Sequence, residues 1–550
     1  MVKYQQISFE RGNNMETSAL YPYPSRRYVT YAARGMCATS NHLAAQAGVD
    51  MLKKGGNAFD AAIAAAACLV VLEPQTNGAG SDAFAIFTQN GGKLQGMNST
   101  GVMGRGFDLQ KMRDKGYKEM PHYGFEPVTV PGAPAAWAAI NEKYGRLPLT
   151  EVLAPAISYA REGQALCTIT WSSINTMASR MRENTDCGPQ FDEWFRIFMP
   201  GGEAPRPGQL FRNPDLADTL EAIAKTQAKD YYQGEIADRI VAASHKFGGF
   251  LEKEDLMEHE VQWVQPLSVP YHGYEVWELP PNGQGIIALM ALNILNGFEP
   301  SPLDDPLGVH RQIEATKLAF IDGLRYIADP RYMEVSPEEM LSPEYAAARR
   351  KLIGQTAIEP APGNPKNPGT VYLCAADNEG NMISYIQSNY AGFGSGVVVP
   401  GTGIALQNRG KGFSLDPESP NAAAPGKRPY HTIIPGFLTK DGKPVGPFGV
   451  MGGFMQPQAH VQVMTKLIDC GLNPQACIDA PRWLWTAGKE VHVETEFSTY
   501  LADSLAQRGH KIVFDTNRGG FGKGQMILRT PFGTLIGGTE PRCEGACAAW

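Results

Sequence analysis

The sequence predicts a mixed α+β protein whose helices and strands are concentrated in different parts of the chain. The stretch 129–330 alternates helical segments with turns rich in proline and glycine, so we expect it to be mainly helical. Beyond residue 370, short apolar runs flank glycine turns, which is typical of β-hairpins. A linker with four prolines, 355–368, separates the two regions. The fold class is therefore α+β, with a boundary near residue 370.

Composition limits the classes of function that the protein can serve. The chain has 550 residues, of which 43% are hydrophobic and 19% charged, as in ordinary globular proteins. Its formal net charge of -7 gives no electrostatic support for nucleic-acid binding. The most apolar stretch, 61–72, is too short to cross a bilayer and suits a buried helix. We therefore expect neither a nucleic-acid partner nor a membrane partner.

The N-terminus and the cysteines both favour the cytoplasm. Residues 1–27 form a polar leader without the apolar core of a secretory signal. The nine cysteines are scattered and odd in number, which argues against a disulfide framework. Cys543 and Cys547 have the spacing of a ligand pair, but no second pair accompanies them, so we predict no metal site.

The first elements are two helices, a glycine loop and a strand. Helical character runs over 40–52, and Asn57 can cap an alanine-rich helix over 58–72 that is apolar on all sides. The loop 75–82 contains glycines but no following Lys-Ser/Thr, and a strand over 83–88 comes after it. A tight turn, or backbone close to a pocket, is therefore favoured over a phosphate-binding loop.

Further elements follow from apolar periodicity and turn residues. The predicted helices are 133–143, 149–162, 216–226, 307–324, 457–470 and 497–508, and the predicted hairpins pair 433–438 with 445–451 and 526–529 with 535–538.

The segment from Gly369 to Gln387 carries the strongest indication of chemistry. It is predicted to form a hairpin whose strands, 370–377 and 382–387, flank a Glu-Gly-Asn turn. A small residue followed by Thr370 at the start of a strand is the arrangement expected of a proenzyme that cuts itself before a threonine. The new α-amino group would then act as the general base for the hydroxyl. Since many strands begin with Gly-Thr, this signal is weak when taken alone.

Two more segments can complete such a site. Ser388, at the end of the second strand, can return close to Thr370, although a polar surface cluster after a strand is the plainer interpretation. Gly452 and Gly453 lie between a strand and a helix, where their N–H groups can form an oxyanion hole or simply a tight turn.

Several segments spread over nearly the whole chain resemble the γ-glutamyltransferases, or glutathione hydrolases, which are N-terminal-nucleophile hydrolases made as proenzymes. These segments are 35–40, 54–62, 128–133, 279–285 and 537–542. The resemblance implies a four-layer αββα sandwich with no metal and no cofactor. It implies a large subunit, 28–369, and a small subunit, 370–550, that form one domain. Thr370 would be the self-cleavage residue and nucleophile, Ser388 its assisting hydroxyl, and Gly452 and Gly453 the oxyanion hole.

The substrate-binding positions depart from that family. Its carboxylate-binding arginine is replaced in the region of Asn98 and Ser99, and its amine-binding aspartate falls on Gly412. An ammonium buried without a partner costs several kcal/mol, so a γ-glutamyl compound is not expected to be the best substrate. The family's asparagine falls on Tyr390 beside Asn389, its glutamine on Arg409, and its paired serines on His431 and Thr432.

Three cationic or titratable side chains offer an alternative way to hold a substrate. Arg409, Arg428 and His431 can form a pocket for a substrate carboxylate. Equally, Arg428 can pair with a structural carboxylate, and His431 can be a core histidine with satisfied hydrogen bonds.

The leading hypothesis is a self-processing threonine amidohydrolase that acts on a small-molecule amide and passes the acyl group to water or to an amine. A first alternative is an amidohydrolase for oxamate or for amides of short dicarboxylic acids. A second alternative is an inactive scaffold or binding protein, against which the presence of Thr370, Ser388 and both glycines argues.

Overall fold

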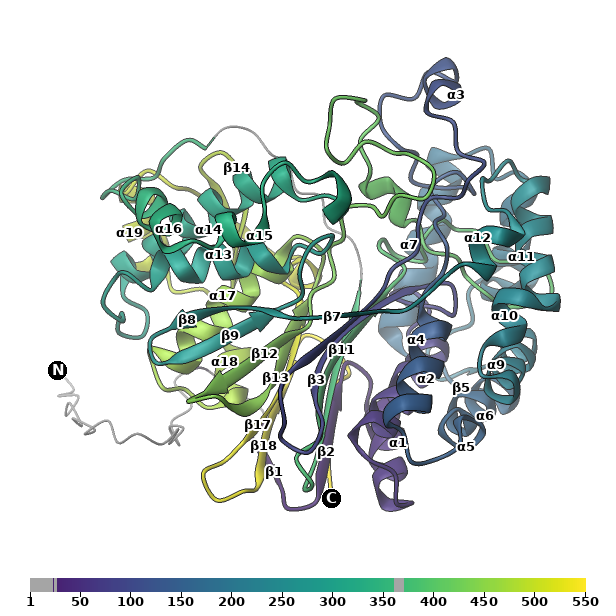
Figure 1. The fold of residues 1–550 in the computed structure, drawn as a ribbon, viewed down its shortest axis with the longest axis horizontal. Helices are drawn as coiled ribbons and strands as arrows, with labels where there is room; N and C mark the ends of the chain where they lie inside the picture. The colour runs from purple at the N-terminus through teal and green to yellow at the C-terminus, as the bar shows by residue number, and fades with distance from the viewer. Residues whose placement is uncertain (1–22, 24–26, 361–369) are drawn as a thin grey trace.

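Two seven-stranded antiparallel sheets face each other at the centre of the molecule, and helices cover their outer faces (Figure 1). The computed structural model describes residues 23, 27–360 and 370–550. The first sheet has the order β1 (Thr30–Ala32), β18 (Leu535–Thr539), β17 (Lys523–Arg529), β13 (Lys443–Met451), β12 (Gly436–Lys440), β9 (Tyr274–Glu278) and β8 (Leu267–Tyr271).

The second sheet contains the predicted hairpin at its centre. Its order is β19 (Ala546–Ala549), β2 (Gly35–Thr39), β10 (Val371–Asp377), β11 (Met382–Ser388), β3 (Asp82–Thr88), β4 (Gln95–Ser99) and β7 (Gln262–Val264). Strands from both sides of the predicted processing point therefore lie side by side in one sheet.

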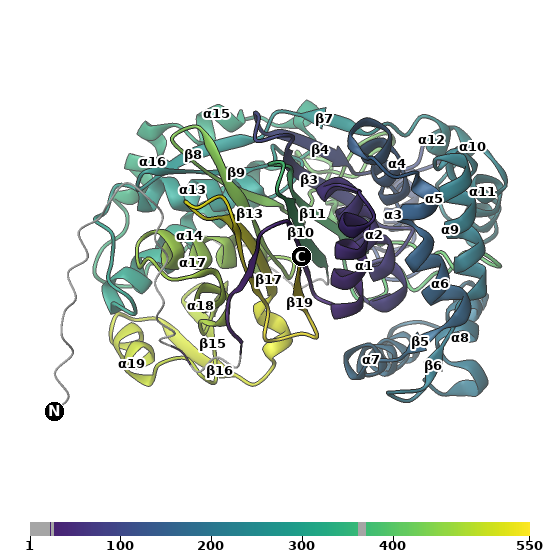
Figure 2. The ribbon, with the colours of Figure 1, turned by 90° about the horizontal axis from the view of Figure 1, so that it is seen from below.

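Helices complete the four-layer αββα sandwich, as Figure 2 shows from below. The second sheet is covered by α1 (His42–Lys53), α2 (Ala58–Leu72), α4 (Ala133–Tyr144) and a helical region that includes α6 (Ala154–Glu162), α7 (Thr168–Asn184), α9 (Pro214–Thr226) and α11 (Glu235–Lys246). The first sheet is covered by α13 (Gly285–Leu295), α14 (Pro306–Tyr326), α17 (Met455–Ile468) and α18 (Pro474–Asp479).

Smaller elements lie at the periphery of the sandwich. They are α3 (Leu109–Asp114), α8 (Asp192–Phe198), α10 (Lys229–Gln233), α12 (Lys253–Met257), α15 (Pro337–Met340), α16 (Pro343–Arg350), α19 (Thr499–Gln507), a small sheet of β14 (Trp483–Ala487), β15 (Glu490–Glu494) and β16 (Lys511–Asp515), and the short pair β5 (Gln164–Ala165) and β6 (Leu210–Phe211).

The side chains of β10 alternate between two separate cores. Val371 and Leu373 point to the core beneath α1 and α2, whereas Tyr372 and Cys374 point to the core between the sheets. This is the period of two that an extended strand imposes. Even-numbered residues of β10 therefore face the opposite sheet, and Thr370 is the next residue in that series.

The predicted cap of the alanine-rich helix is confirmed. The Asn57 side chain accepts hydrogen bonds from the N–H groups of Phe59 and Asp60, and the Asp60 carboxylate accepts one from the Asn57 N–H. This reciprocal capping box satisfies N–H groups that the helix itself leaves open. Every residue of α2 is buried.

Two predicted elements differ from the structure for identifiable reasons. The single helix over 149–162 is divided into α5 (Leu149–Val152) and α6. Pro155, in the first turn of α6, has no N–H to donate to the carbonyl four residues earlier, so the helical hydrogen bonds are interrupted there. The strand over 433–438 begins only at Gly436. The N–H groups of Ile433 and Ile434 are bound by the side chains of His431 and Gln456 instead of by a neighbouring strand.

Parts of two predicted segments lie outside the described residues. They are most of the leader, 1–27, and residues 361–368 of the linker, together with Gly369 that follows it. Among the residues that are described, no helix is long and apolar enough to cross a membrane.

Candidate active site

Three side chains form a row across the ends of three neighbouring strands. Val371 pairs with Gln387, so Thr370 lies next to Ser388, and Ser388 pairs directly with Asp82 on β3. Residues that are directly opposite each other in antiparallel strands share one face of the sheet. Thr370, Ser388 and Asp82 therefore all face the space between the two sheets, and all three are fully buried.

The two hydroxyl groups of this row are in hydrogen-bond contact. Thr370 Oγ1 and Ser388 Oγ lie 3.1 Å apart. Ser388 Oγ also accepts a hydrogen bond of 2.8 Å from the backbone N–H of Tyr390. Tyr390 has a φ of 73°, an unusual conformation for a residue with a large side chain. The tight turn after β11 thus directs a backbone donor at the Ser388 hydroxyl.

The glycine pair lies at the end of β13, on the sheet that faces Thr370. Gly449 of this strand packs so closely against Tyr372 that an added Cβ would lie 2.4 Å from the ring. Gly452 and Gly453 have φ values of 137° and 60°, so the turn requires conformations that favour glycine. Their carbonyl groups accept hydrogen bonds from the N–H groups of Met455 and Gln456, the first two residues of α17.

The N–H groups of this turn remain available for a ligand. Among the described residues, none accepts a hydrogen bond from the N–H of Gly452 or Gly453. Gln284 fixes the turn from the other side, because its Nε2 donates to the carbonyl of Gly453 at 2.8 Å. Such a turn can stabilise the negative charge that develops on a carbonyl oxygen under attack.

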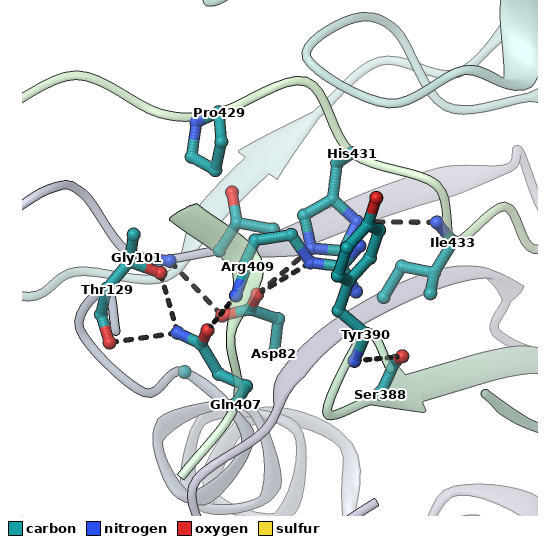
Figure 3. A network of polar contacts seen from close by, with 12 residues as sticks. Asp82, Gly101, Thr129, Ser388, Tyr390, Gln407, Arg409, Pro429, His431 and Ile433 are labelled. Carbon is teal, nitrogen blue, oxygen red and sulfur yellow. Dashed lines mark hydrogen bonds and ion pairs between the residues drawn. The ribbon is translucent and has the colours of Figure 1, made fainter. Parts of the chain in front are cut away.

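Asp82 is the centre of a buried polar cluster beside the hydroxyl pair (Figure 3). Arg409 Nε lies 3.4 Å and His431 Nε2 3.0 Å from its Oδ2. Arg409 Nη1 donates to Thr432 Oγ1 at 2.9 Å. The guanidinium carbon lies 4.5 Å from the centre of the Tyr390 ring, a cation–π contact.

Burial controls the protonation of this cluster. Burial raises the pKa of Asp82 to about 7, although Arg409 acts to lower it. Burial, together with the positive charge of Arg409, lowers the pKa of His431 well below its ordinary value. His431 is therefore neutral, and its two contacts set the tautomer: Nε2–H donates to Asp82, and Nδ1 accepts the N–H of Ile433. The pKa of Arg409 falls to about 10, so Arg409 stays charged at neutral pH.

The structure brings Arg409, His431, Thr432 and Tyr390 together, but it adds an acid that the sequence analysis did not include. Asp82 compensates the charge of Arg409 when it is ionised, and His431 is uncharged, so the predicted pocket is less cationic than its arginines suggest. The signal that could have revealed Asp82 is the strand register, since the residue just before 83–88 falls opposite Ser388.

Arg428, Asn98 and Asn389 lie around this cluster. Arg428 Nε donates to the carbonyl of Thr100 at 3.1 Å, and its backbone N–H donates to the structural carboxylate of Asp329. The Asn98 side chain donates to Asn282 and accepts from Thr100. Asn389 Oδ1 accepts from Ser81 at 2.8 Å.

One group of described residues has the composition of a metal site, and it lies outside this row. His310 and Glu314 on α14 and His510 before β16 are buried together, with His310 Nδ1 2.8 Å from His510 Nε2. Glu314 already binds the ammonium of Lys317 at 2.7 Å. A cation at this point would be repelled by that ammonium, so the donor set does not fit a metal well.

Comparison with known proteins identifies the family of this chain. The family profile described as Gamma-glutamyltranspeptidase matches residues 44–550. The chain belongs to this family. It is 37% identical to the glutathione hydrolase-like YwrD proenzyme of Bacillus subtilis over 526 residues, which covers 93% of this chain and 97% of the relative. It is 35% identical to the oxamate amidohydrolase proenzyme of Klebsiella pneumoniae, over 94% of this chain and 99% of the relative.

A solved structure is more similar still. The crystal structure of cephalosporin acylase from Bacillus halodurans is 55% identical in sequence and superposes with a TM-score of 0.93. The match covers 97% of this chain and 99% of the acylase. This gamma-glutamyltranspeptidase family member is therefore an enzyme of the N-terminal-nucleophile hydrolase class, a self-processing amidohydrolase or acyltransferase.

Proposed function

We propose that the protein cuts itself between Gly369 and Thr370 and then uses Thr370 to hydrolyse or transfer the acyl group of a small amide. The observation that carries this proposal is the 3.1 Å contact between the Thr370 and Ser388 hydroxyl groups, where Thr370 directly precedes the central strand β10. Several relatives are named proenzymes, which supports a single precursor that is cleaved. The products would be a large subunit of 369 residues and a small subunit of 181 (550 minus 369).

Each residue of the proposed site has a separate role in the reaction. After cleavage, the Thr370 amine accepts the proton of its own hydroxyl, and the oxygen attacks the amide carbonyl. The N–H groups of Gly452 and Gly453 stabilise the oxyanion, and Ser388 orients the nucleophile. When the carbon–nitrogen bond breaks, the departing nitrogen takes the proton. Water, or an acceptor amine, then attacks the ester on Thr370 and releases the acyl group.

We infer that the preferred acyl group is short and ends in a carboxylate. Gly412 stands where the amine-binding aspartate of the glutathione hydrolases is expected, so a γ-glutamyl ammonium has no obvious partner at this position. Arg409 Nη2 is buried, and no described residue accepts its hydrogen bonds. A substrate carboxylate would supply that acceptor. The oxamate amidohydrolase among the relatives fits this class, whereas the glutathione hydrolases among them keep a γ-glutamyl donor as the alternative.

A substrate panel distinguishes these donors. The processed enzyme is assayed with oxamate, with glutathione, and with the half-4-nitroanilides of malonic, succinic and glutaric acids. Each half-anilide is matched by the compound in which a carboxamide replaces the free carboxylate. We expect at least one carboxylate donor to exceed both glutathione and its own carboxamide in kcat/KM. Faster turnover of glutathione than of every carboxylate donor would contradict the proposed acyl group.

Replacement of Arg409 tests the carboxylate contact itself. The measured quantity is kcat/KM for the best carboxylate donor divided by kcat/KM for its carboxamide. In Arg409→Gln, we expect this ratio to fall by about 10-fold or more, because hydrogen bonds to charged groups contribute about 1.5–3 kcal/mol. Arg409→Lys keeps the charge and should retain part of the ratio. An unchanged ratio in Arg409→Gln would show that the carboxylate binds elsewhere.

A further inference from the structure

A buried carboxylate lies next to the hydroxyl pair, and its hydrogen bonds to described residues run to Gly101, Arg409 and His431. Asp82 begins β3 directly opposite Ser388, so the order across the sheet is Thr370, Ser388, Asp82. Neighbouring strands are about 4.8 Å apart, which places Asp82 about two strand spacings from the nucleophile. This distance is too long for Asp82 to exchange a proton with Thr370 directly, so a role in catalysis has to pass through other residues.

Such a connection exists through Arg409 and Tyr390. Asp82 and Thr432 hold Arg409 at two different nitrogens, Nε and Nη1, which fixes the plane of the guanidinium group. The Tyr390 ring lies against that group at 4.5 Å. The backbone N–H of Tyr390 in turn donates to Ser388 Oγ. Figure 3 shows Asp82, Arg409, Tyr390 and Ser388 in this order.

The backbone of Tyr390 explains why this turn needs support. A residue with a bulky side chain rarely adopts a φ of 73°, the value at Tyr390. Such conformations persist only where surrounding contacts hold them. The guanidinium group against the ring is one such contact, and its own orientation depends on Asp82. His431 binds the same oxygen of this carboxylate, since its Nε2–H donates to Asp82 Oδ2.

We propose that Asp82 is a positioning residue, which holds Arg409 against the Tyr390 ring and thereby keeps the Tyr390 N–H on Ser388 and Ser388 on the nucleophile. The proposal rests on the proposed function, because it takes Thr370 as the nucleophile. It assigns to Asp82 an effect on the rate of the chemical step with every donor, whether or not the donor carries a carboxylate. Arg409 acts in the same chain in addition to any contact with the substrate.

The test uses Asp82→Asn, which keeps the size of the side chain and removes its charge, and Asp82→Glu, which keeps the charge. The rate of self-processing is followed by intact mass, and kcat and KM are measured with an uncharged carboxamide donor. We expect Asp82→Asn to lower kcat by roughly 10- to 100-fold with KM changed less than about threefold, because small displacements of a catalytic group have effects of this size. Asp82→Glu should recover part of the loss. Ser388→Ala provides the reference for complete loss of the assisting hydroxyl.

Two further variants separate positioning from stability. Asp322→Asn removes another buried carboxylate that is paired with an arginine, Arg349, between α14 and α16, and it should leave kcat unchanged. The double variant Asp82→Asn/Arg409→Met removes both charges, so no arginine is left buried without a partner. It should fold even if the single variant does not, and it should still show the lowered kcat.

An unchanged kcat with the uncharged donor, in Asp82→Asn or in the double variant, would overturn the positioning role. So would a change confined to the KM of carboxylate donors, which would make Asp82 a specificity residue. Failure of the proposed function would give a different result. Thr370→Ala would then still be cut between residues 369 and 370, and this result does not depend on how the Asp82 variants behave.

Discussion

At the scale of single residues, the site combines a hydroxyl pair with a buried ion pair. Thr370 and Ser388 are neighbours in a local hairpin, so the hairpin together with the family resemblance predicted their approach, although a surface polar cluster was the plainer interpretation of Ser388 alone. Asp82 reaches Arg409 and His431 across 327 and 349 residues of chain. No local pattern reports a contact of that range, and only the order of the strands brings these residues together. The hairpin half of the site was therefore predictable, whereas its charge balance was not.

The buried carboxylate predicts a specific dependence of stability on pH. Asp82 has a raised pKa in the folded chain, about 7, against an ordinary value of about 3.9 in the unfolded chain. Between these values, the folded chain binds more protons than the unfolded chain, so the contribution of Asp82 to the free energy of unfolding falls as pH rises from about 4 to about 7. Below and above this window, its contribution is constant.

This dependence is measured by urea unfolding of the uncut Thr370→Ala chain between pH 4.5 and pH 8, with and without Asp82→Asn. We expect the variant to lose part of the downward slope across the window, because Asn does not titrate. Parallel curves for the two proteins would show that Asp82 keeps an ordinary pKa in the folded chain.

At the scale of elements, the turn between β13 and α17 contains the proposed oxyanion hole. The pair of glycines, and a helix after a strand, were predicted from the sequence, and the positive φ values explain why glycine is required. The predicted bounds of the helix over 149–162 and of the strand over 433–438 were less accurate. A proline breaks the first, and side chains from distant segments bind the backbone at the start of the second.

Gly452→Ala tests the turn. An added Cβ would lie 3.0 Å from the Cα of Gly522, in a conformation that alanine rarely adopts. We expect kcat to fall by about 100-fold, in the range seen when an oxyanion donor is lost. Gly442→Ala is the matched control. Gly442 has a φ of 72° in the β12–β13 turn, and nothing lies within 4 Å of an added Cβ. Alanine at this position would therefore introduce similar backbone strain at a place outside the candidate active site.

Equal loss of activity in the two glycine variants would mean that general strain, and not the position of the N–H groups, explains the effect. Circular dichroism and thermal melting of both proteins confirm that the comparison is between folded chains.

At the scale of the whole molecule, the sandwich explains how one chain can be cut and still keep its site. In the second sheet, β10 pairs with β2, and β11 pairs with β3. In the first sheet, β12 pairs with β9. Each sheet therefore contains strands from both proposed subunits, and hydrogen bonds between strands hold the two pieces together after the peptide bond is broken. The α+β class could be read from local patterns, but this interleaving depends on long-range pairing.

The intact mass of the purified protein under denaturing conditions, with the N-terminal sequence of any smaller piece, is the most direct test of self-processing. The uncut chain has a mass of 59.7 kDa. We predict pieces of roughly 40 and 20 kDa for the wild type, the smaller of which begins with Thr370, and a whole chain for Thr370→Ala. Cleavage at another bond, or cleavage of Thr370→Ala at the same bond and rate as the wild type, would contradict the central claim that Thr370 is both the processing residue and the nucleophile.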